Sequence, residues 1–222
     1  MAARGALTRA AASANIIAMF DAKLRPLIDR PLARLAIPLV RLGFSANQIT
    51  VAGLAAGLAA AGAIALGHTI WGLALIALSR LADGLDGAVA RQTRQTDFGG
   101  YLDITLDFVF YAAIPVGFGL LHPDNAVPAL VLLAGFVLSG TSFLAFAVLA
   151  AKRGISTDIR GKKSFYFVGG LTEGAETIAF FVLACLKPGW FWWMAYIFAG
   201  LCVLTAVTRT LEARAVFRRE PP

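Results

Sequence analysis

Four aspartates stand in two apolar segments of the chain, at spacings that suit a shared site. Asp83 and Asp86 are three residues apart, and Asp103 and Asp107 are four residues apart. On α-helices these separations place each pair on one helix face. If the two segments are antiparallel neighbours joined by a turn near residues 93–97, both pairs reach the same depth. The sequence therefore predicts a cluster of four carboxylates.

Such a cluster needs positive charge beside it. Removing a carboxylate from water costs several kcal/mol, and neighbouring carboxylates repel one another. Carboxylate oxygens prefer Mg²⁺, Mn²⁺ or Ca²⁺, and neither histidine nor cysteine lies in this stretch to favour zinc. Two divalent ions held by shared carboxylates would leave open positions for phosphate oxygens. We therefore expect a metal centre that binds a phosphorylated substrate.

Small residues follow the first two aspartates along the same helix. Gly84, Gly87, Ala88 and Ala90 carry little or no side chain, so a pyrophosphate or nucleotide is expected to approach the backbone there. Arg91, one turn after Gly87, is suited to bidentate contact with a phosphate.

Buried ion pairs are the structural alternative for these carboxylates. Their partners would be Arg80, Arg91, Arg94 and Arg209. Ionisable residues within membrane segments are costly and usually functional, so the pattern as a whole favours the metal centre.

The composition places the chain among integral membrane proteins. Of its 222 residues 59% are hydrophobic and 15% are charged, and the mean hydropathy is +0.74. A helix needs about 20 apolar residues to cross a bilayer. We expect an all-α protein with six spans, at residues 49–66, 70–91, 98–121, 126–151, 167–186 and 190–210. Glycines in the first and fourth spans, Gly53, Gly57, Gly62, Gly135 and Gly140, are expected to permit close helix contacts.

Basic residues predict the orientation in the membrane. Nineteen of the 20 Lys and Arg residues fall on one side of the six expected spans, and only Lys187 falls on the other. Because basic residues stay on the cytoplasmic side, both termini and the aspartates are predicted to be cytoplasmic. The net charge of +7 suits a membrane surface and phosphorylated substrates, and no motif for nucleic-acid recognition is present.

The segment before the first span alternates apolar and basic residues. Pro26, Pro31 and Pro38 are expected to break any single long helix in it. We expect short amphipathic pieces at the cytoplasmic interface from about residue 15 to residue 42. A disordered basic tail is the alternative.

The aspartates belong to a longer pattern, Asp83-x-x-Asp86-Gly87-x-x-Ala90-Arg91, seven further residues, then Gly99-x-x-x-Asp103-x-x-x-Asp107. Eight positions at fixed spacing resemble the signature of the CDP-alcohol phosphatidyltransferases. The layout of six spans after an interfacial helix is similar as well. The resemblance implies a basic tail and interfacial segment at 1–44, a catalytic domain at 45–211 and a basic cytoplasmic tail at 212–222.

The resemblance also implies roles for individual residues. Similar enzymes bind two Mg²⁺ or Mn²⁺ ions through the four motif aspartates, and the last, here Asp107, is the base that deprotonates an acceptor alcohol. The acceptor attacks CDP-diacylglycerol, and CMP leaves. The resemblance implies contacts with the CDP-diacylglycerol substrate from Asn47, Thr50, Gly87, Ala90, Arg91, Thr96 and Gly99. It further implies a homodimer, and a place in the bacterial inner membrane is expected.

Two features bear on the acceptor. The basic residues Arg153, Arg160 and Lys163 suit a phosphorylated acceptor such as glycerol 3-phosphate or inositol phosphate, and they also suit an ordinary cytoplasmic loop. Glu173 and Glu176, near the start of the fifth span, suit an ammonium head group such as choline, ethanolamine or serine, or a structural pair with Arg209.

Two other classes of membrane protein use intramembrane carboxylates. A divalent-cation transporter would distribute them over broken helices near the middle of the membrane. An intramembrane prenyltransferase would carry two separate Asp-rich motifs, whereas this chain has one compound motif. Both remain alternatives to phosphatidyl transfer at this point.

Overall fold

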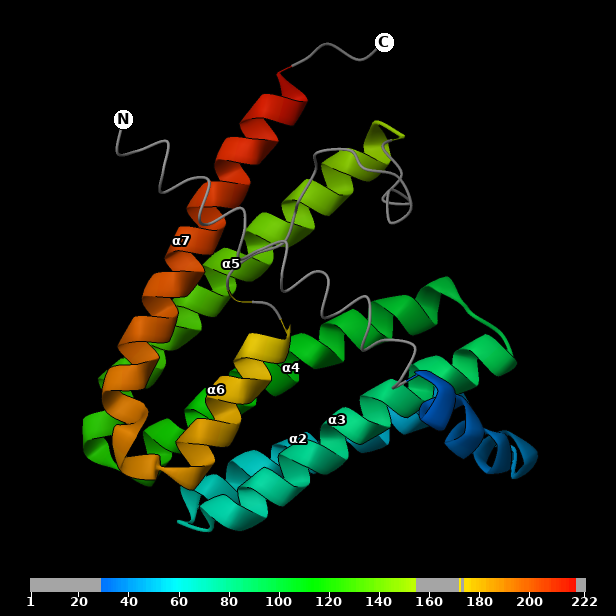
Figure 1. Ribbon diagram of the computed structural model, residues 1–222, viewed down its shortest axis with the longest axis horizontal. Helices are drawn as coiled ribbons and strands as arrows, with labels where there is room; N and C mark the ends of the chain where they lie inside the picture. The colour runs from blue at the N-terminus through cyan, green and yellow to red at the C-terminus, as the bar shows by residue number, and fades with distance from the viewer. Residues whose placement is uncertain (1–28, 155–171, 173, 219–222) are drawn as a thin grey trace. The chain divides into compact units, whose positions relative to one another are not determined.

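The computed structural model describes residues 29–154, 172 and 174–218, and this part of the chain is all helical (Figure 1). Residues 29–41 form a first helix, called here the 29–41 helix. The longer helices are α2 (Ala46–Ala65), α3 (Thr69–Gln92), α4 (Asp97–Leu121), α5 (Ala126–Lys152), α6 (Gly174–Leu186) and α7 (Phe191–Phe217). Two 3₁₀ turns, Pro123–Asn125 and Pro188–Trp190, precede α5 and α7. The expected all-α class is confirmed.

Four segments in the described part of the chain are long and apolar enough to cross a membrane. They are Ala46–Ala65, Asp97–Leu121, Pro123–Lys152 and Pro188–Phe217. Helix α3 carries four charged residues from its middle onward, Arg80, Asp83, Asp86 and Arg91, which lowers its hydropathy. Helix α6 is a shorter apolar helix, and the expected start of that span, near residue 167, lies outside the described residues. Six spans therefore remain a prediction.

The described helices fall into two compact units. Among the described residues, the first comprises 29–56 and 77–108, and the second comprises 57–76, 109–154, 172 and 174–218. All four motif aspartates belong to the first unit.

The first unit has a small apolar core between the 29–41 helix, the start of α2 and the second half of α3. Ala36, Ile49, Ala88 and Val89 are buried in it. The side-chain amide of Gln92 donates a 2.8 Å hydrogen bond to the carbonyl of Ala33. The 29–41 helix is therefore held against α3, the helix that carries Asp83 and Asp86, by apolar packing and by this hydrogen bond.

The prolines do not break this helix as expected. Pro38 lies within it, and its carbonyl accepts a 3.0 Å hydrogen bond from the N–H of Leu42. Proline removes one backbone donor, and the packing of Ala36 and its neighbours holds the helix together despite that loss. Pro26 lies outside the described residues.

A sharp connection joins the 29–41 helix to α2. Gly43 has φ +82°, and the N–H of Phe44 bonds to the carbonyl of Leu39, which together form a Schellman ending. Ser45 then caps α2: its hydroxyl accepts from the N–H of Gln48, and the Gln48 side chain accepts from the N–H of Ser45. These two local motifs define where α2 begins.

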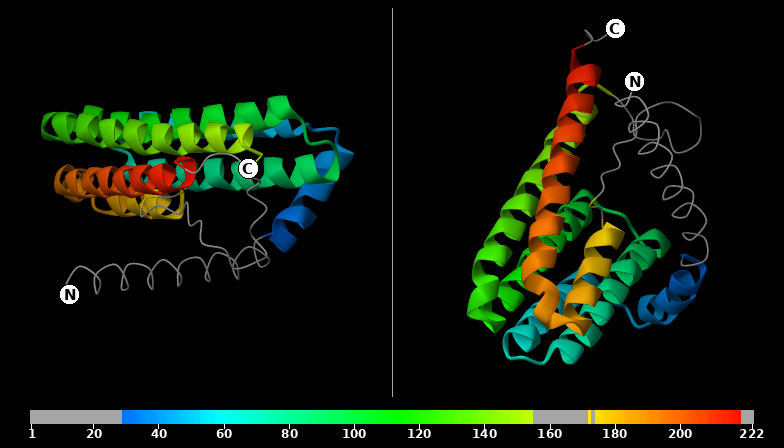
Figure 2. Two further views of the ribbon diagram at one scale, coloured as in Figure 1. Left: turned by 90° about the horizontal axis from the view of Figure 1, so that it is seen from above. Right: turned by 60° about the vertical axis from the view of Figure 1, so that its left-hand side comes forward.

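In the second unit α5 and α7 lie side by side along much of their length (Figure 2). Close approach depends on Gly135, where an added Cβ would lie 3.2 Å from the Cα of Ala199. Phe118 and Phe191 stack with ring centroids 4.6 Å apart in the same unit. Of the glycines expected to allow such contacts, Gly53 and Gly135 do so, but Gly62 has no atom within 4 Å of its missing Cβ.

Gly117 supplies a test of this packing. A Cβ there would lie 2.5 Å from the carbonyl oxygen of Ala61, a backbone atom that cannot rotate away. We expect Gly117→Ala to destabilise the protein by about 1–3 kcal/mol. Gly62→Ala is the matched control: it meets no neighbour, so it should leave stability unchanged or raise it by up to about 1 kcal/mol. Thermal unfolding in detergent, followed by tryptophan fluorescence, measures both; equal midpoints would contradict the packing described.

Candidate functional site

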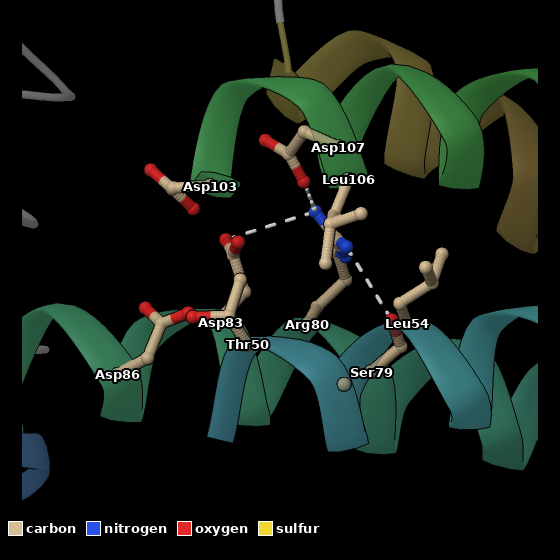
Figure 3. Close-up of a pocket in the computed structure, with 10 residues that line it drawn as sticks. Thr50, Leu54, Ser79, Arg80, Asp83, Asp86, Asp103, Leu106 and Asp107 are labelled. Carbon is tan, nitrogen blue, oxygen red and sulfur yellow. Dashed lines mark hydrogen bonds and ion pairs between the residues drawn. The ribbon is translucent and has the colours of Figure 1, made fainter. Parts of the chain in front are cut away.

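The motif aspartates converge between α3 and α4, within the first unit. Asp103 and Asp107 extend from α4 toward Asp83 and Asp86 on α3 (Figure 3). One carboxylate oxygen each from Asp83, Asp103 and Asp107 lies within 4.8 Å of the others. The helical spacing of three and four residues places these side chains on the facing sides of their helices. We call these three residues the carboxylate group.

Asp86 lies beside the carboxylate group but is not part of it. Its side chain lines the same pocket, and the residue is 5% exposed. Thr50 lies next to it, yet Asp86 Oδ2 is buried without a hydrogen-bond partner in the described part of the protein. A buried oxygen of this kind is suited to a ligand because an unsatisfied acceptor costs about 1–3 kcal/mol.

Arg80 supplies the positive charge inside this site. Its Nη1 lies 2.8 Å from Asp107 Oδ1 and 3.6 Å from Asp83 Oδ2, so one nitrogen bridges α3 and α4. The ion pairing of Arg80 expected in the structural alternative is present. The signal was the three-residue spacing between Arg80 and Asp83, which places both on one helix face.

The pocket between these helices encloses about 230 Å³ of space free of protein atoms, part of it open to solvent. Ten residues line it: Thr50, Gly53, Leu54, Ser79, Arg80, Asp83, Asp86, Asp103, Leu106 and Asp107. All four motif aspartates therefore face one pocket. Gly53 lets α2 approach α3, because a Cβ there would lie 3.0 Å from that of Ala82.

A divalent cation fits this donor set. Three carboxylates with oxygens within 4.8 Å and a fourth with an unsatisfied buried oxygen provide only hard oxygen ligands. Such ligands suit Mg²⁺ or Mn²⁺ and disfavour softer metals.

Three of the residues predicted to bind nucleotide meet at the start of α4. The hydroxyl of Thr96 accepts a 3.0 Å hydrogen bond from the N–H of Gly99 and so caps the helix. A Cβ on Gly99 would lie 3.1 Å from that hydroxyl oxygen and 3.2 Å from Asn47 Oδ1. Thr50, one turn after Asn47, donates to the carbonyl of Ala46 and lines the pocket.

The small residues of α3 divide between two faces, which corrects the expectation that all of them leave room for phosphate. A Cβ on Gly84 would lie 2.9 Å from Leu32 Cδ1, and Ala88 is buried in the apolar core. These two residues face the 29–41 helix. Gly87 is open except for Arg91 Nη1, which would lie 3.4 Å from an added Cβ.

Arg91 is exposed and lies at the end of α3. Its Nη2 is 3.6 Å from Asp29 Oδ1, an ion pair with both partners about half exposed. The contact leaves the guanidinium accessible. Ala90, the remaining member of the motif, is partly buried.

Two of the residues predicted to bind the acceptor, Arg153 and Glu176, belong to the second unit. Arg153 donates a 2.9 Å hydrogen bond to the carbonyl of Phe217 and lies over its ring, so it joins the ends of α5 and α7. Glu176 is partly buried in the first turn of α6. Arg160, Lys163 and Glu173 lie outside the described residues.

Arg209, expected as a partner of the glutamates, is buried in α7. Its Nη1 donates to the carbonyl of Ser139 at 3.0 Å and to the hydroxyl of Ser142 at 3.2 Å, and its guanidinium lies over the ring of Phe143. These contacts connect α7 to α5.

Apolar helices that carry this carboxylate site define an integral membrane protein with a candidate divalent-cation centre. The model of the CDP-alcohol phosphatidyltransferase family matches residues 44–208. The chain therefore belongs to the CDP-alcohol phosphatidyltransferase family and is an enzyme that transfers substituted phosphate groups.

Two curated relatives illustrate the range of similarity. Inner membrane protein YnjF of Escherichia coli strain K12 is 49% identical over 192 residues, which cover 86% of this chain and 93% of that protein. Archaetidylinositol phosphate synthase of Pyrococcus horikoshii is 37% identical over 99 residues, 44% of this chain and 53% of that protein. The match to the synthase thus spans about half of either chain.

A solved structure shares the fold. Phosphatidylinositol phosphate synthase of Mycobacterium tuberculosis with CDP-DAG bound has a TM-score of 0.63 at 22% identity, over 83% of this chain and 94% of that chain. The same protein in complex with manganese and citrate has a TM-score of 0.62, again at 22% identity, over 82% of this chain and 88% of that chain.

The carboxylate group can be tested by direct metal binding. We expect Asp83→Asn to weaken Mn²⁺ binding by more than about 100-fold, because losing even an outer partner of a metal site costs about 10- to 100-fold. Asp97→Asn removes the same charge from the exposed first turn of α4 and should leave the affinity unchanged. Electron paramagnetic resonance of free Mn²⁺ during titration measures the Mn²⁺ affinity of each variant. If Asp83→Asn and Asp97→Asn bound Mn²⁺ equally well, the carboxylate group would not be the metal site.

Proposed function

We propose that the protein transfers the phosphatidyl group of CDP-diacylglycerol to an acceptor alcohol, with release of CMP, at the carboxylate group and Asp86. The observation that carries the proposal is the convergence of Asp83, Asp103 and Asp107 from two helices inside the family's match. The neighbour with CDP-DAG bound and its manganese complex support the choice of donor and of metal.

Each part of the motif has a role in this proposal. The four aspartates would hold two divalent ions, Mg²⁺ or Mn²⁺, and Asp107 would also take the proton of the acceptor hydroxyl. Bound divalent ions would stabilise negative charge on the pyrophosphate. The CDP moiety contacts Asn47, Thr50, Gly87, Ala90, Arg91, Thr96 and Gly99. Accessible Arg91 and open Gly87 support this role for the end of α3.

The acceptor we propose is inositol phosphate. The curated synthases that match part of this chain, from Pyrococcus horikoshii and Mycolicibacterium smegmatis, are named for archaetidylinositol phosphate and phosphatidylinositol phosphate. Arg153, Arg160 and Lys163 offer positive charge to a phosphorylated acceptor. Glu173 and Glu176 suit an ammonium alcohol instead, which makes the two acceptor classes separable by experiment.

We further propose six spans with both termini and the active site on the cytoplasmic side of a bacterial inner membrane, and a homodimer. The distribution of basic residues supports the cytoplasmic side, and the inner-membrane relative supports the membrane location. The proposed division is an interfacial segment at 1–44, a catalytic domain at 45–211 and a cytoplasmic tail at 212–222.

The reaction is tested by CMP release from CDP-diacylglycerol with Mg²⁺ or Mn²⁺. A panel of inositol phosphate, glycerol 3-phosphate, serine, choline and ethanolamine is expected to give CMP with inositol phosphate. Asp107→Asn should lower kcat by about 100-fold or more, since general-base catalysis contributes about 10²–10⁴-fold, whereas Asp97→Asn should retain activity. Full activity of Asp107→Asn, or no CMP with any acceptor, would refute the mechanism.

Glu176 distinguishes the two acceptor classes. If the acceptor is inositol phosphate, Glu176→Gln should leave the acceptor KM unchanged or lower it, because an acid repels a phosphate. If the acceptor carries an ammonium group, the same change should raise its KM. Steady-state kinetics at saturating CDP-diacylglycerol measures this, and a raised KM for inositol phosphate would contradict the repulsion between Glu176 and its phosphate.

A further inference from the structure

Arg80 contacts two of the three residues of the carboxylate group. One nitrogen, Nη1, contacts Asp107 Oδ1 on α4 at 2.8 Å and Asp83 Oδ2 on α3 at 3.6 Å, and Nη2 donates to the hydroxyl of Ser79 at 3.3 Å (Figure 3). The arginine side chain is only 19% exposed. The guanidinium is thus held inside the pocket by both helices.

The carboxylates that Arg80 bridges are also two of the three that make up the carboxylate group. A divalent cation and a guanidinium bind the same lone pairs of a carboxylate oxygen. An oxygen that coordinates a metal ion therefore has fewer lone pairs left to accept hydrogen bonds from Arg80. The two cations also repel, and in a pocket shielded from bulk water this repulsion is stronger than at an open surface. Arg80 and a metal ion therefore compete for Asp83 and Asp107.

We propose that Arg80 is a built-in counter-cation that keeps Asp83 and Asp107 assembled and is exchanged, at least from one of them, when a divalent ion binds. This inference rests on the metal site of the proposed function. Arg80 is a positioning residue: it acts on the carboxylates. Because Arg80 must be displaced, the affinity for the metal is lowered. The contacts of Arg80 with the carboxylates stabilise the protein when no metal is bound.

The geometry suits arginine. Its planar, permanently charged guanidinium contacts Asp107 through Nη1 and Ser79 through Nη2. Nη2 can therefore keep its contact with Ser79 while Nη1 moves away from a carboxylate. A lysine keeps the charge but has a single nitrogen for both contacts. Charge and shape can therefore be separated by substitution.

Mn²⁺ binding and thermal stability of the full chain in detergent test the exchange. We expect Arg80→Met to bind Mn²⁺ about tenfold or more tightly, since two charges about 4 Å apart at a protein surface interact by several RT. Its unfolding midpoint should fall without metal and should rise more than that of the wild type when Mn²⁺ is added. Arg80→Gln is a second neutral variant with the same expected direction, should Arg80→Met fold poorly.

Two matched variants serve as controls. Arg80→Lys keeps the charge, so its Mn²⁺ affinity should stay near that of the wild type. Arg94→Met removes a positive charge from the exposed turn between α3 and α4 and should change neither readout. The signature of exchange is a gain in affinity confined to the neutral variants at position 80.

Each other outcome overturns the inference. Unchanged or weaker Mn²⁺ binding by both neutral variants would mean that Arg80 does not compete with the metal. Equal losses of stability with and without Mn²⁺ would assign Arg80 to packing alone. If the wild type and Asp103→Asn bind Mn²⁺ equally, or neither binds it, the metal site itself fails, whatever the result at Arg80.

Discussion

The repulsion among carboxylates gathered between apolar helices is the constraint on which the first unit depends. Asp83, Asp103 and Asp107 hold oxygens within 4.8 Å of one another, and Asp86 lies beside them in the same pocket. Helices that carry such a group separate unless positive charge and packing oppose the repulsion. Arg80 supplies the charge by bridging α3 and α4, and the apolar core with the 29–41 helix supplies the packing.

The two faces of α3 explain how packing and chemistry share one helix. Asp83 lines the pocket and Gly87, four residues later, lies on the same helix face, whereas Gly84 and Ala88, also four apart, face the 29–41 helix. Contact of Leu32 with Gly84 fixes the rotation of α3 about its axis. The rotation in turn determines how far the carboxylates reach toward α4. The 29–41 helix therefore supports the site although it contributes no residue to the pocket lining.

Hydropathy predicted the helices, and helical spacing with a turn near residues 93–97 predicted the convergence of Asp83, Asp103 and Asp107. Spacing could not show whether a given glycine or alanine of α3 faces a phosphate or packs against another helix, because small residues suit both roles. It also could not reveal that Pro38 lies inside a helix or that Arg80 reaches across to Asp107 on α4. These features depend on tertiary contacts: Ala36 of the 29–41 helix packs against Ala88 and Val89 of α3, and Arg80 contacts Asp107, 27 residues away.

Formal charge then bears on how many ions the site would hold. Four aspartates and Arg80 carry a net charge of −3. One divalent ion would leave the pocket at −1, which still repels a pyrophosphate, whereas two would bring it to +1, which attracts one. Without Arg80 two ions would only neutralise the aspartates. The arginine thus has opposite effects on the two kinds of ligand: it disfavours the metal and, once two ions are bound, favours the anionic substrate, so that metal and substrate support each other's binding.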